Sequence, residues 1–125
     1  MSDAESHSHD AKVIGPGTWD MMHRTSVSSD PTLFILVVKF VYDNFPCAVC
    51  RRHFQEYCTK NPPWKLKPEP DKEGNDLSRF KWMWICHNVV NERLGKRIVE
   101  WIMAVRMYLQ SPLCTEGCSE EEGKA

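Results

Sequence analysis

The sequence predicts an all-α protein, a five-helix bundle with a four-helix core and a short fifth helix. Three observations support this fold class. Apolar residues recur at helical spacing in several segments, no segment alternates polar and apolar residues as a strand does, and Pro, Gly, Asp and Asn separate the segments. The chain has 125 residues, 42% apolar and 26% charged, which is enough for one domain with a real core.

The first two helices are predicted from their entry signals. Thr18 is a candidate N-cap, and Trp19, Met22, His23 and Ser26 then fall on one helical face. Asp30 caps the second helix and Pro31 takes its first position. This second helix is apolar on most sides, so we expect it to be central.

The remaining helices follow the same logic. Asn44 offers a cap, so a third helix is predicted from Cys47 to about Cys58. Four prolines between residues 60 and 76 predict a loop. A fourth helix reaches Leu94 with Gly95 just past its end. The last helix carries an apolar stripe formed by Ile98, Trp101, Ile102, Val105 and Leu109.

Three regions are expected along the chain. Residues 1–12 are polar and acidic and predict a disordered tail, residues 13–110 form the folded domain, and residues 111–125 form a flexible tail with a Cys pair. The net charge of −1 disfavours nucleic-acid binding. The longest apolar run, residues 33–38, is too short to span a membrane, and the N-terminal segment lacks a secretory signal.

A Cys-x-x-Cys pair at Cys47 and Cys50 predicts redox chemistry. A cysteine in the first turn of a helix meets unpaired N–H groups and the positive end of the dipole, which favour the thiolate. Cys50 follows one turn later, and Arg51 and Arg52 add positive charge. Because the thiolate is the species that exchanges disulfides, a cycling dithiol is the favoured interpretation.

Two alternatives stay open for this segment. Cys47, Cys50, His53 and Cys58 are all zinc-ligand types and would make a non-enzymatic interaction module. On one helix these four side chains fan around the axis, which disfavours zinc. A helical scaffold with static disulfides is the other alternative.

The other cysteines allow two interpretations each. Cys114 and Cys118 flank a glycine near the end of the chain and could form a mobile dithiol that carries electrons, or an inert pair. Cys58 and Cys86 fall in apolar helices, where they could be ordinary buried thiols or a mutual disulfide.

Polar residues in the fourth helix suggest a binding site. His87 and Asn91 share a face at i and i+4, with Asn88 beside them and Trp84 a turn earlier. Trp19 and His23 repeat the spacing in the first helix. Core packing explains either pair alone, but together, beside a Cys-x-x-Cys pair, they predict a site for a large, partly aromatic ligand.

Three blocks, "GPGTWDMMH", "FPCAVC" and "HNVVNERLGK", resemble those of the Erv/ALR family of FAD-dependent sulfhydryl oxidases, in particular its small viral members. The resemblance spans roughly residues 14 to 110. It implies a helical bundle that encloses FAD, often as a homodimer. It also implies an enzyme that takes electrons from thiol-containing protein substrates and passes them to dioxygen, giving hydrogen peroxide. We expect a cytoplasmic location, which for a viral protein means the host cell cytoplasm or the virion, with the mitochondrial intermembrane space as the alternative.

The resemblance also implies roles for individual residues. Cys47 would take the attack of an incoming thiolate, Cys50 would lie against the flavin, and Cys114 and Cys118 would be the shuttle pair. The residues matching the family's FAD-binding positions are Gly15, Thr18, Trp19, His23, Cys50, His87, Asn88, Val90, Asn91, Leu94, Lys96 and Tyr108.

Two features depart from the family pattern. The structural disulfide that many cellular members carry after the fourth helix has no counterpart, because no cysteine lies between Cys86 and Cys114. Serines 26, 28 and 29 stand where an aromatic residue often follows the first-helix histidine.

Overall fold

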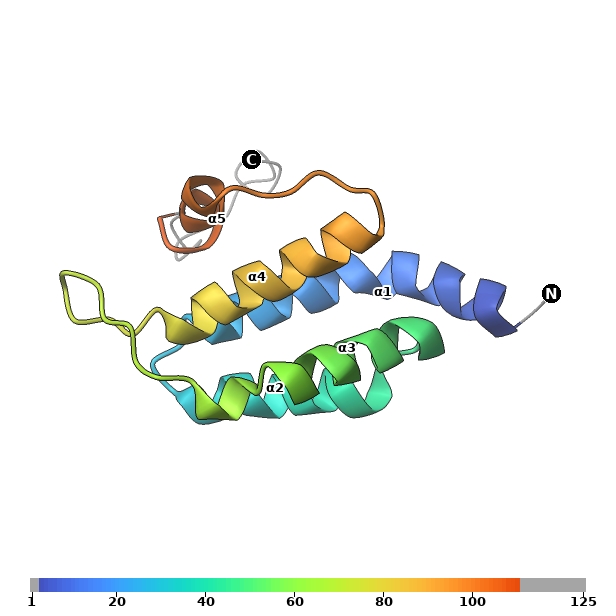
Figure 1. Cartoon of the computed structure of the whole chain (residues 1–125), viewed down its shortest axis with the longest axis horizontal. Helices are drawn as coiled ribbons and strands as arrows, with labels where there is room; N and C mark the ends of the chain where they lie inside the picture. Colours follow the sequence, from blue (N-terminus) through green and yellow to red (C-terminus); the bar gives the residue numbers. More distant parts are fainter. Residues whose placement is uncertain (1–2, 111–125) are drawn as a thin grey trace, which may run out of the picture.

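A computed structural model gives the architecture, and it describes residues 3–110, with side chains from residue 13 onward. These residues form five α-helices in chain order (Figure 1). Their bounds are α1 (Asp3–Ser26), α2 (Pro31–Asn44), α3 (Ala48–Lys60), α4 (Ser78–Arg93) and α5 (Trp101–Tyr108), with a 3₁₀ turn η1 (Pro63–Lys65) between α3 and α4. The described chain contains no strand beyond one isolated bridge, so the all-α prediction is confirmed.

The core lies where α1, α2, α3 and α4 meet. Helix α1 packs against α2, α3 and α4, and α2 packs against α3. Each helix contributes side chains that are at most 2% exposed, namely Met22, Phe34, Val38, Cys58, Phe80, Met83 and Cys86. Burial of this apolar surface is the main stabilising contribution to the bundle.

Helix α1 begins earlier than the sequence suggested. Its backbone is helical from Asp3 and runs through Pro16, within the segment expected to be a disordered tail. Thr18 is therefore inside the helix, where its Oγ1 donates to the carbonyl of Ile14 at 3.0 Å, and the N-cap prediction for Thr18 is wrong. Met22, His23 and Ser26 are buried on one face, as predicted.

Helix α2 is not central, in contrast to the prediction. The carboxylate of Asp30 caps it by accepting from the Thr32 N–H at 2.9 Å, as expected. One face buries Phe34, Val38 and Val41, whereas Leu36 and Phe40 are 60% and 65% exposed. Because α2 has apolar residues on most of its faces, its sequence alone does not reveal which face the other helices cover.

The C-terminal end of α4 follows the prediction closely. Gly95 has φ of +69°, a conformation that favours glycine. Its N–H donates to the Glu92 carbonyl at 3.1 Å, and the Lys96 N–H donates to the Asn91 carbonyl at 2.7 Å. These two bonds form a Schellman motif, which ends the helix and fixes the chain direction toward α5.

Helix α5 lies on the outer side of α4 (Figure 1), and aromatic rings attach it to α1 and α4. Trp101 packs edge-on against Phe80 and Trp84, and Tyr108 packs against Phe80 and stacks on His23. The predicted apolar stripe is partly wrong, because Ile98 and Ile102 are about half exposed. The small residue Ala104, 2% exposed, faces the bundle instead and permits close approach.

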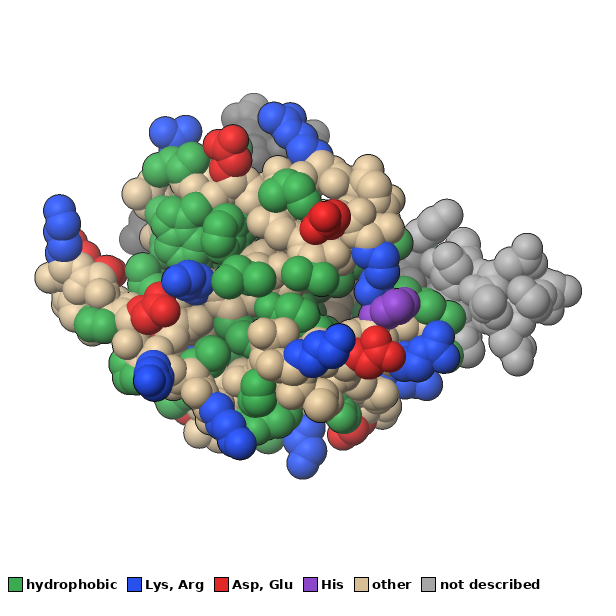
Figure 2. Space-filling model, viewed as in Figure 1, with side chains coloured by type: hydrophobic (Ala, Val, Ile, Leu, Met, Phe, Trp, Pro, Cys, Tyr) green, Lys and Arg blue, Asp and Glu red, His purple; other side chains and the backbone are tan. Residues whose placement is uncertain are grey.

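The face of the molecule seen in Figure 2 has no dominant charge. On the face in Figure 2, Lys and Arg side chains are interspersed with Asp and Glu, and hydrophobic side chains reach the surface around α5. Among the described helices, none has the length and apolar character needed to cross a membrane.

Candidate functional site

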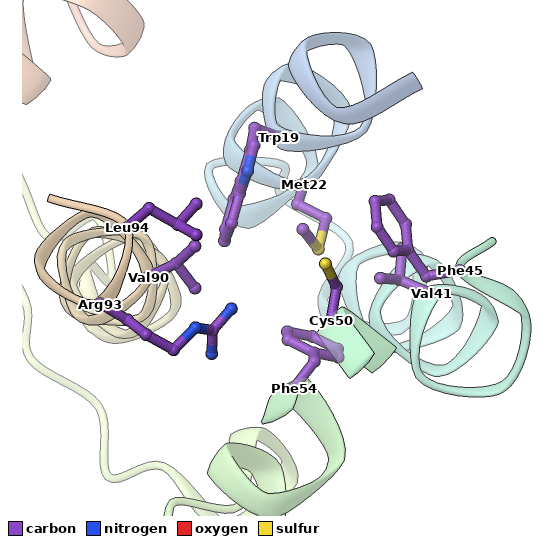
Figure 3. A pocket seen from close by; sticks show the side chains of 9 residues that line it. All are labelled: Trp19, Met22, Val41, Phe45, Cys50, Phe54, Val90, Arg93 and Leu94. Atoms are coloured by element: carbon purple, nitrogen blue, oxygen red, sulfur yellow. The ribbon is translucent and has the colours of Figure 1, made fainter. Parts of the chain in front are cut away.

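The second cysteine of the first Cys-x-x-Cys pair lines an apolar pocket between four helices. Cys50 lines this pocket together with Trp19 of α1 and Val90 of α4 (Figure 3). The other lining residues are Met22, Val41, Phe45, Phe54, Arg93 and Leu94. The three sequence blocks, far apart in the chain, thus meet around one cavity with a thiol in its wall.

Cys47 and Cys50 form the start of α3, although differently from the prediction. Asn44 ends α2, and Cys47 itself is the N-cap of α3. Its Sγ accepts from the Cys50 N–H at 3.2 Å, so an unpaired amide of the helix start does reach this sulfur. Both thiols are free, and Cys47 is 5% exposed.

The electrostatics of Cys50 differ from the expectation. Burial raises the pKa of the Cys50 thiol to about 11, and the hydrogen bond and charge of Cys47 act in the same direction. Arg93 opposes this by lowering the pKa. Arg51 instead donates to the Phe45 carbonyl at 2.6 Å, so its guanidinium stabilises the turn before α3.

A cluster of stacked rings adjoins this pocket. Trp19 stacks on His87 with centroids 4.0 Å apart and planes 5° apart, and His23 stacks on Tyr108 at 4.4 Å. The two histidines are joined by a hydrogen bond of 2.9 Å between His23 Nε2 and His87 Nδ1. Trp19, His23, His87 and Tyr108, which were predicted as site residues from distant segments, are therefore in mutual contact.

Both histidines are held neutral. Burial lowers the pKa of His23 to about 4, with the charge of His87 acting in the same direction and Asp20 opposing the shift. Burial likewise lowers the pKa of His87 to about 4, with Lys96 acting in the same direction. Neutral imidazoles let one ring donate to the other. His23 Nδ1 is buried and has no hydrogen-bond partner among the described residues, which is unusual for a buried polar atom.

A second, smaller pocket lies on the α5 side of this ring cluster. It is lined by His23, Trp84, His87, Asn88, Val99, Ala104, Met107 and Tyr108. Trp19 lines the first pocket and His87 the second, so their ring stack lies between the two.

Asn88 has a role that the sequence did not suggest. Its Nδ2 donates to the Val99 carbonyl at 2.8 Å, and its Oδ1 accepts from the Val99 N–H at 2.9 Å. Trp84 Nε1 donates to the same carbonyl at 2.8 Å. These bonds hold the segment that leads into α5 and thereby form one wall of the second pocket.

Besides Cys47, four residues predicted to bind FAD do not line either pocket. Asn91 is 7% exposed and its Nδ2 donates to Asn88 Oδ1 at 3.4 Å. Gly15 is buried, Thr18 bonds within α1, and Lys96 is exposed at the end of α4. Lys96 is nevertheless near enough to His87 to affect its pKa.

The zinc alternative does not fit the geometry of α3. Cys58 is fully buried, whereas the side chain of His53 is 37% exposed and lies 4.0 Å from Glu56. The described residues contain no cluster of three or more His, Cys, Asp or Glu side chains suited to a metal.

Cys58 and Cys86 are free buried thiols in the core. Burial raises the pKa of Cys58 to about 12, and it raises that of Cys86, with the charge of Cys58 adding to the effect. This agrees with the interpretation as ordinary buried thiols. Cys114 and Cys118 lie outside the described residues.

Sequence reasoning missed several residues of the first pocket. Met22 follows Trp19 by three positions, and Arg93 follows Val90 by three, so helical spacing from the predicted residues could have identified them. Phe45 and Phe54 flank the cysteine pair in sequence. Arg93 is the one cation among the nine lining residues.

Comparison with known proteins agrees with this arrangement. The chain is 30% identical over 110 residues to an FAD-linked sulfhydryl oxidase of African swine fever virus (isolate Tick/Malawi/Lil 20-1/1983), with 81% of this chain and 84% of the viral protein covered. It is 35% identical over 80 residues to the protein of the same name in isolate Pig/Kenya/KEN-50/1950, covering 63% of this chain and 59% of the relative.

A plant relative is much longer. The chain is 34% identical over 84 residues to Sulfhydryl oxidase 1 of Arabidopsis thaliana, which corresponds to 64% of this chain but only 14% of the plant protein. The sequence model of the Erv1/Alr family matches residues 16–108, which include α5 and both pockets. The chain therefore belongs to the Erv1/Alr family.

Proposed function

We propose that this protein is an FAD-linked sulfhydryl oxidase that forms disulfides in protein substrates. The observation that carries the proposal is the position of Cys50 in the wall of an apolar pocket, opposite the Trp19 and Val90 side chains (Figure 3). Family membership and the names of the viral relatives support the same activity.

The residues of the two pockets fit FAD. Apolar walls with one thiol and one cation suit a flat aromatic ring, and Trp19, Val90 and Leu94 would hold it. The second pocket offers aromatic and polar side chains, and the buried His23 Nδ1 has no partner there among the described residues. His23, His87 and Tyr108 would hold the other half of the cofactor. When bound, FAD supplies a two-electron acceptor beside Cys50.

The cysteines divide the exchange chemistry between them. A substrate thiolate attacks Cys47, the Cys47–Cys50 bond breaks, and Cys50 leaves with the electron pair while a mixed disulfide forms at Cys47. A second substrate thiolate attacks that mixed disulfide and releases the oxidised substrate, leaving Cys47 and Cys50 reduced. Cys114 and Cys118 are proposed to relay this exchange.

Dioxygen is the proposed terminal acceptor. Two substrate thiols give one disulfide, two electrons and two protons, and dioxygen takes these up to give hydrogen peroxide. The protein contributes an apolar cavity beside Cys50, and two neutral histidines adjoin this cavity through the stack of His87 on Trp19.

The experiment that tests the function is thiol oxidation by the Cys50→Ser variant. Oxygen consumption with a reduced protein substrate is expected to fall at least roughly 100-fold, because the dithiol beside the pocket is lost. Cys58→Ser is the matched control, since its thiol is buried away from the pocket. Full turnover by Cys50→Ser would contradict the proposal.

A homodimer is also proposed, through the uncovered face of α2. Leu33, Leu36 and Phe40 lie at i, i+3 and i+7 on this face and are 44%, 60% and 65% exposed. A continuous apolar stripe of this kind is typical of a contact surface, and two copies of one helix can pair about a two-fold axis. Light scattering should show a dimer that Phe40→Glu converts to a monomer and the neighbouring Lys39→Glu does not. A monomeric wild-type protein at tens of micromolar would contradict it.

A further inference from the structure

The first pocket contains a cation, Arg93, that the exchange chemistry proposed above does not use. Arg93 lies in the last turn of α4, and its guanidinium points into the space between Cys50 and Trp19 (Figure 3). In the part of the chain that the structure describes, no ion pair or hydrogen bond of the Arg93 side chain is found. Its charge is therefore directed at the cavity rather than neutralised by a carboxylate.

The cations that the sequence placed beside the dithiol do not have this position. Arg51 uses its guanidinium on the Phe45 carbonyl, and Arg52 is exposed on α3. Neither lines the pocket, whereas Arg93 and Cys50 both do.

We propose that Arg93 is a positioning residue for the reaction, whose guanidinium stabilises the Cys50 thiolate released when the Cys47–Cys50 disulfide is attacked. This inference rests on the proposed function for its place in the exchange. A leaving thiolate departs faster when its negative charge is stabilised, so Arg93 acts on the bond that breaks. The charge comes from α4, which lines the same pocket as Cys50.

The surroundings of Cys50 leave Arg93 as the one opposing charge. Helices α1 and α2 present Trp19, Met22, Val41 and Phe45 to the pocket, none of which is charged. On α3, Cys47 disfavours the Cys50 thiolate, as does burial. Arg93 on α4 and the Cys50 backbone N–H act in the other direction. Removing the guanidinium should therefore raise the pKa of the Cys50 thiol, because burial and Cys47 both raise it and only the Cys50 backbone N–H still lowers it.

The test is the pH dependence of alkylation of Cys50 by iodoacetamide in the full chain, with the dithiol reduced under nitrogen. Peptide mass spectrometry reads the Cys50 peptide separately from the other cysteines. In Arg93→Gln, we expect the profile to shift to higher pH by about 0.5 to 1 unit, which slows alkylation roughly 3- to 10-fold at a fixed pH below the pKa. Arg93→Lys should restore most of the shift, because it keeps the charge.

Arg52→Gln is the matched control. It removes a cation two residues from Cys50 that lies outside the pocket, and its profile should equal that of the wild type. An unshifted Arg93→Gln profile, or an equal shift in Arg52→Gln, would overturn the proposal.

A measurement on the unaltered protein gives an independent answer. Arg93 as a residue is exposed, so raising the salt concentration screens its charge. The wild-type profile should therefore move toward that of Arg93→Gln, while the variant's own profile moves less. Equal salt shifts in both proteins would also overturn the proposal.

Alkylation requires neither FAD nor substrate, so the two proposals fail separately. If the protein oxidises no thiol but Arg93→Gln shifts the pH profile of Cys50 alkylation, the proposed function is contradicted and the role of Arg93 at the Cys50 thiolate is supported. If the protein oxidises thiols but the profile does not shift, only the role of Arg93 is contradicted.

Discussion

The hydrogen bonds of Asn88 lead to a quantitative prediction about how α5 is held. Asn88→Ala removes both bonds to the Val99 backbone, of 2.8 and 2.9 Å. Each such bond contributes about 1 kcal/mol, and the Val99 N–H would be left without this partner, so the expected loss in the free energy of unfolding is about 2 to 3 kcal/mol. The loss stays in this range because Trp84 Nε1 still donates to the Val99 carbonyl.

The assay is urea and thermal unfolding followed by circular dichroism. A loss of that size lowers Tm by roughly 6 to 12 °C in a domain of this length. Asn44→Ala is the control, because this exposed asparagine makes a single bond of 3.1 Å to the Phe40 carbonyl within its own helix. It should cost less than about 0.5 kcal/mol.

Repeating the measurement with excess FAD separates the two roles of Asn88. If Asn88 only holds Val99, FAD binds the wild type and the variant equally well. FAD should then increase the free energy of unfolding by the same amount in both proteins. A loss below about 0.5 kcal/mol, equal to that of the Asn44 control, would refute the reasoning.

Two further predictions concern the ring cluster and the core. His23 and His87 have pKa values of about 4 in the folded protein, against 6.5 normally. Between these two pH values the unfolded chain binds more protons than the folded protein, so the free energy of unfolding decreases as the pH is lowered. From pH 6.5 to 5, the free energy of unfolding of the flavin-free protein should fall by about 1 to 3 kcal/mol per pH unit in urea titrations, and a flat profile would contradict this. Met83→Ala should lower the free energy of unfolding by about 2 to 5 kcal/mol, because Met83 is 0% exposed. Met103 in α5 is 47% exposed, so Met103→Ala should change this free energy little. Equal losses for the two variants in urea unfolding would show that the core is misassigned.

Helix positions were predictable where local chemistry decides them. The Asp30 cap, the Gly95 turn and the buried face of Met22 and His23 all follow from short-range spacing, and the structure has them as expected. The start of α1 was not predictable in this way, because Thr18 is as acceptable inside a helix as before one.

Contacts between residues far apart in the sequence were harder to predict. The composition of α2 could not show that Leu36 and Phe40 face outward, because that depends on which helices pack against it. Similarly, Asn88 had the residue type of a ligand-binding amide, and only the course of the chain after α4 brings Val99 to it.

The candidate site shows the same division. The resemblance of three blocks predicted Trp19, His23 and Cys50 as site residues, and the fold brings them to one region. Arg93 was overlooked because the sequence offered nearer cations, and only the packing of α4 against α1 and α3 gives it a place in the pocket.

The flavin content of the purified protein tests the central claim most directly. If the cavity beside Cys50 is a flavin site, the protein should show the absorbance bands of bound flavin and release about one FAD per chain on denaturation. A colourless protein that takes up no flavin after incubation with excess FAD would contradict the account.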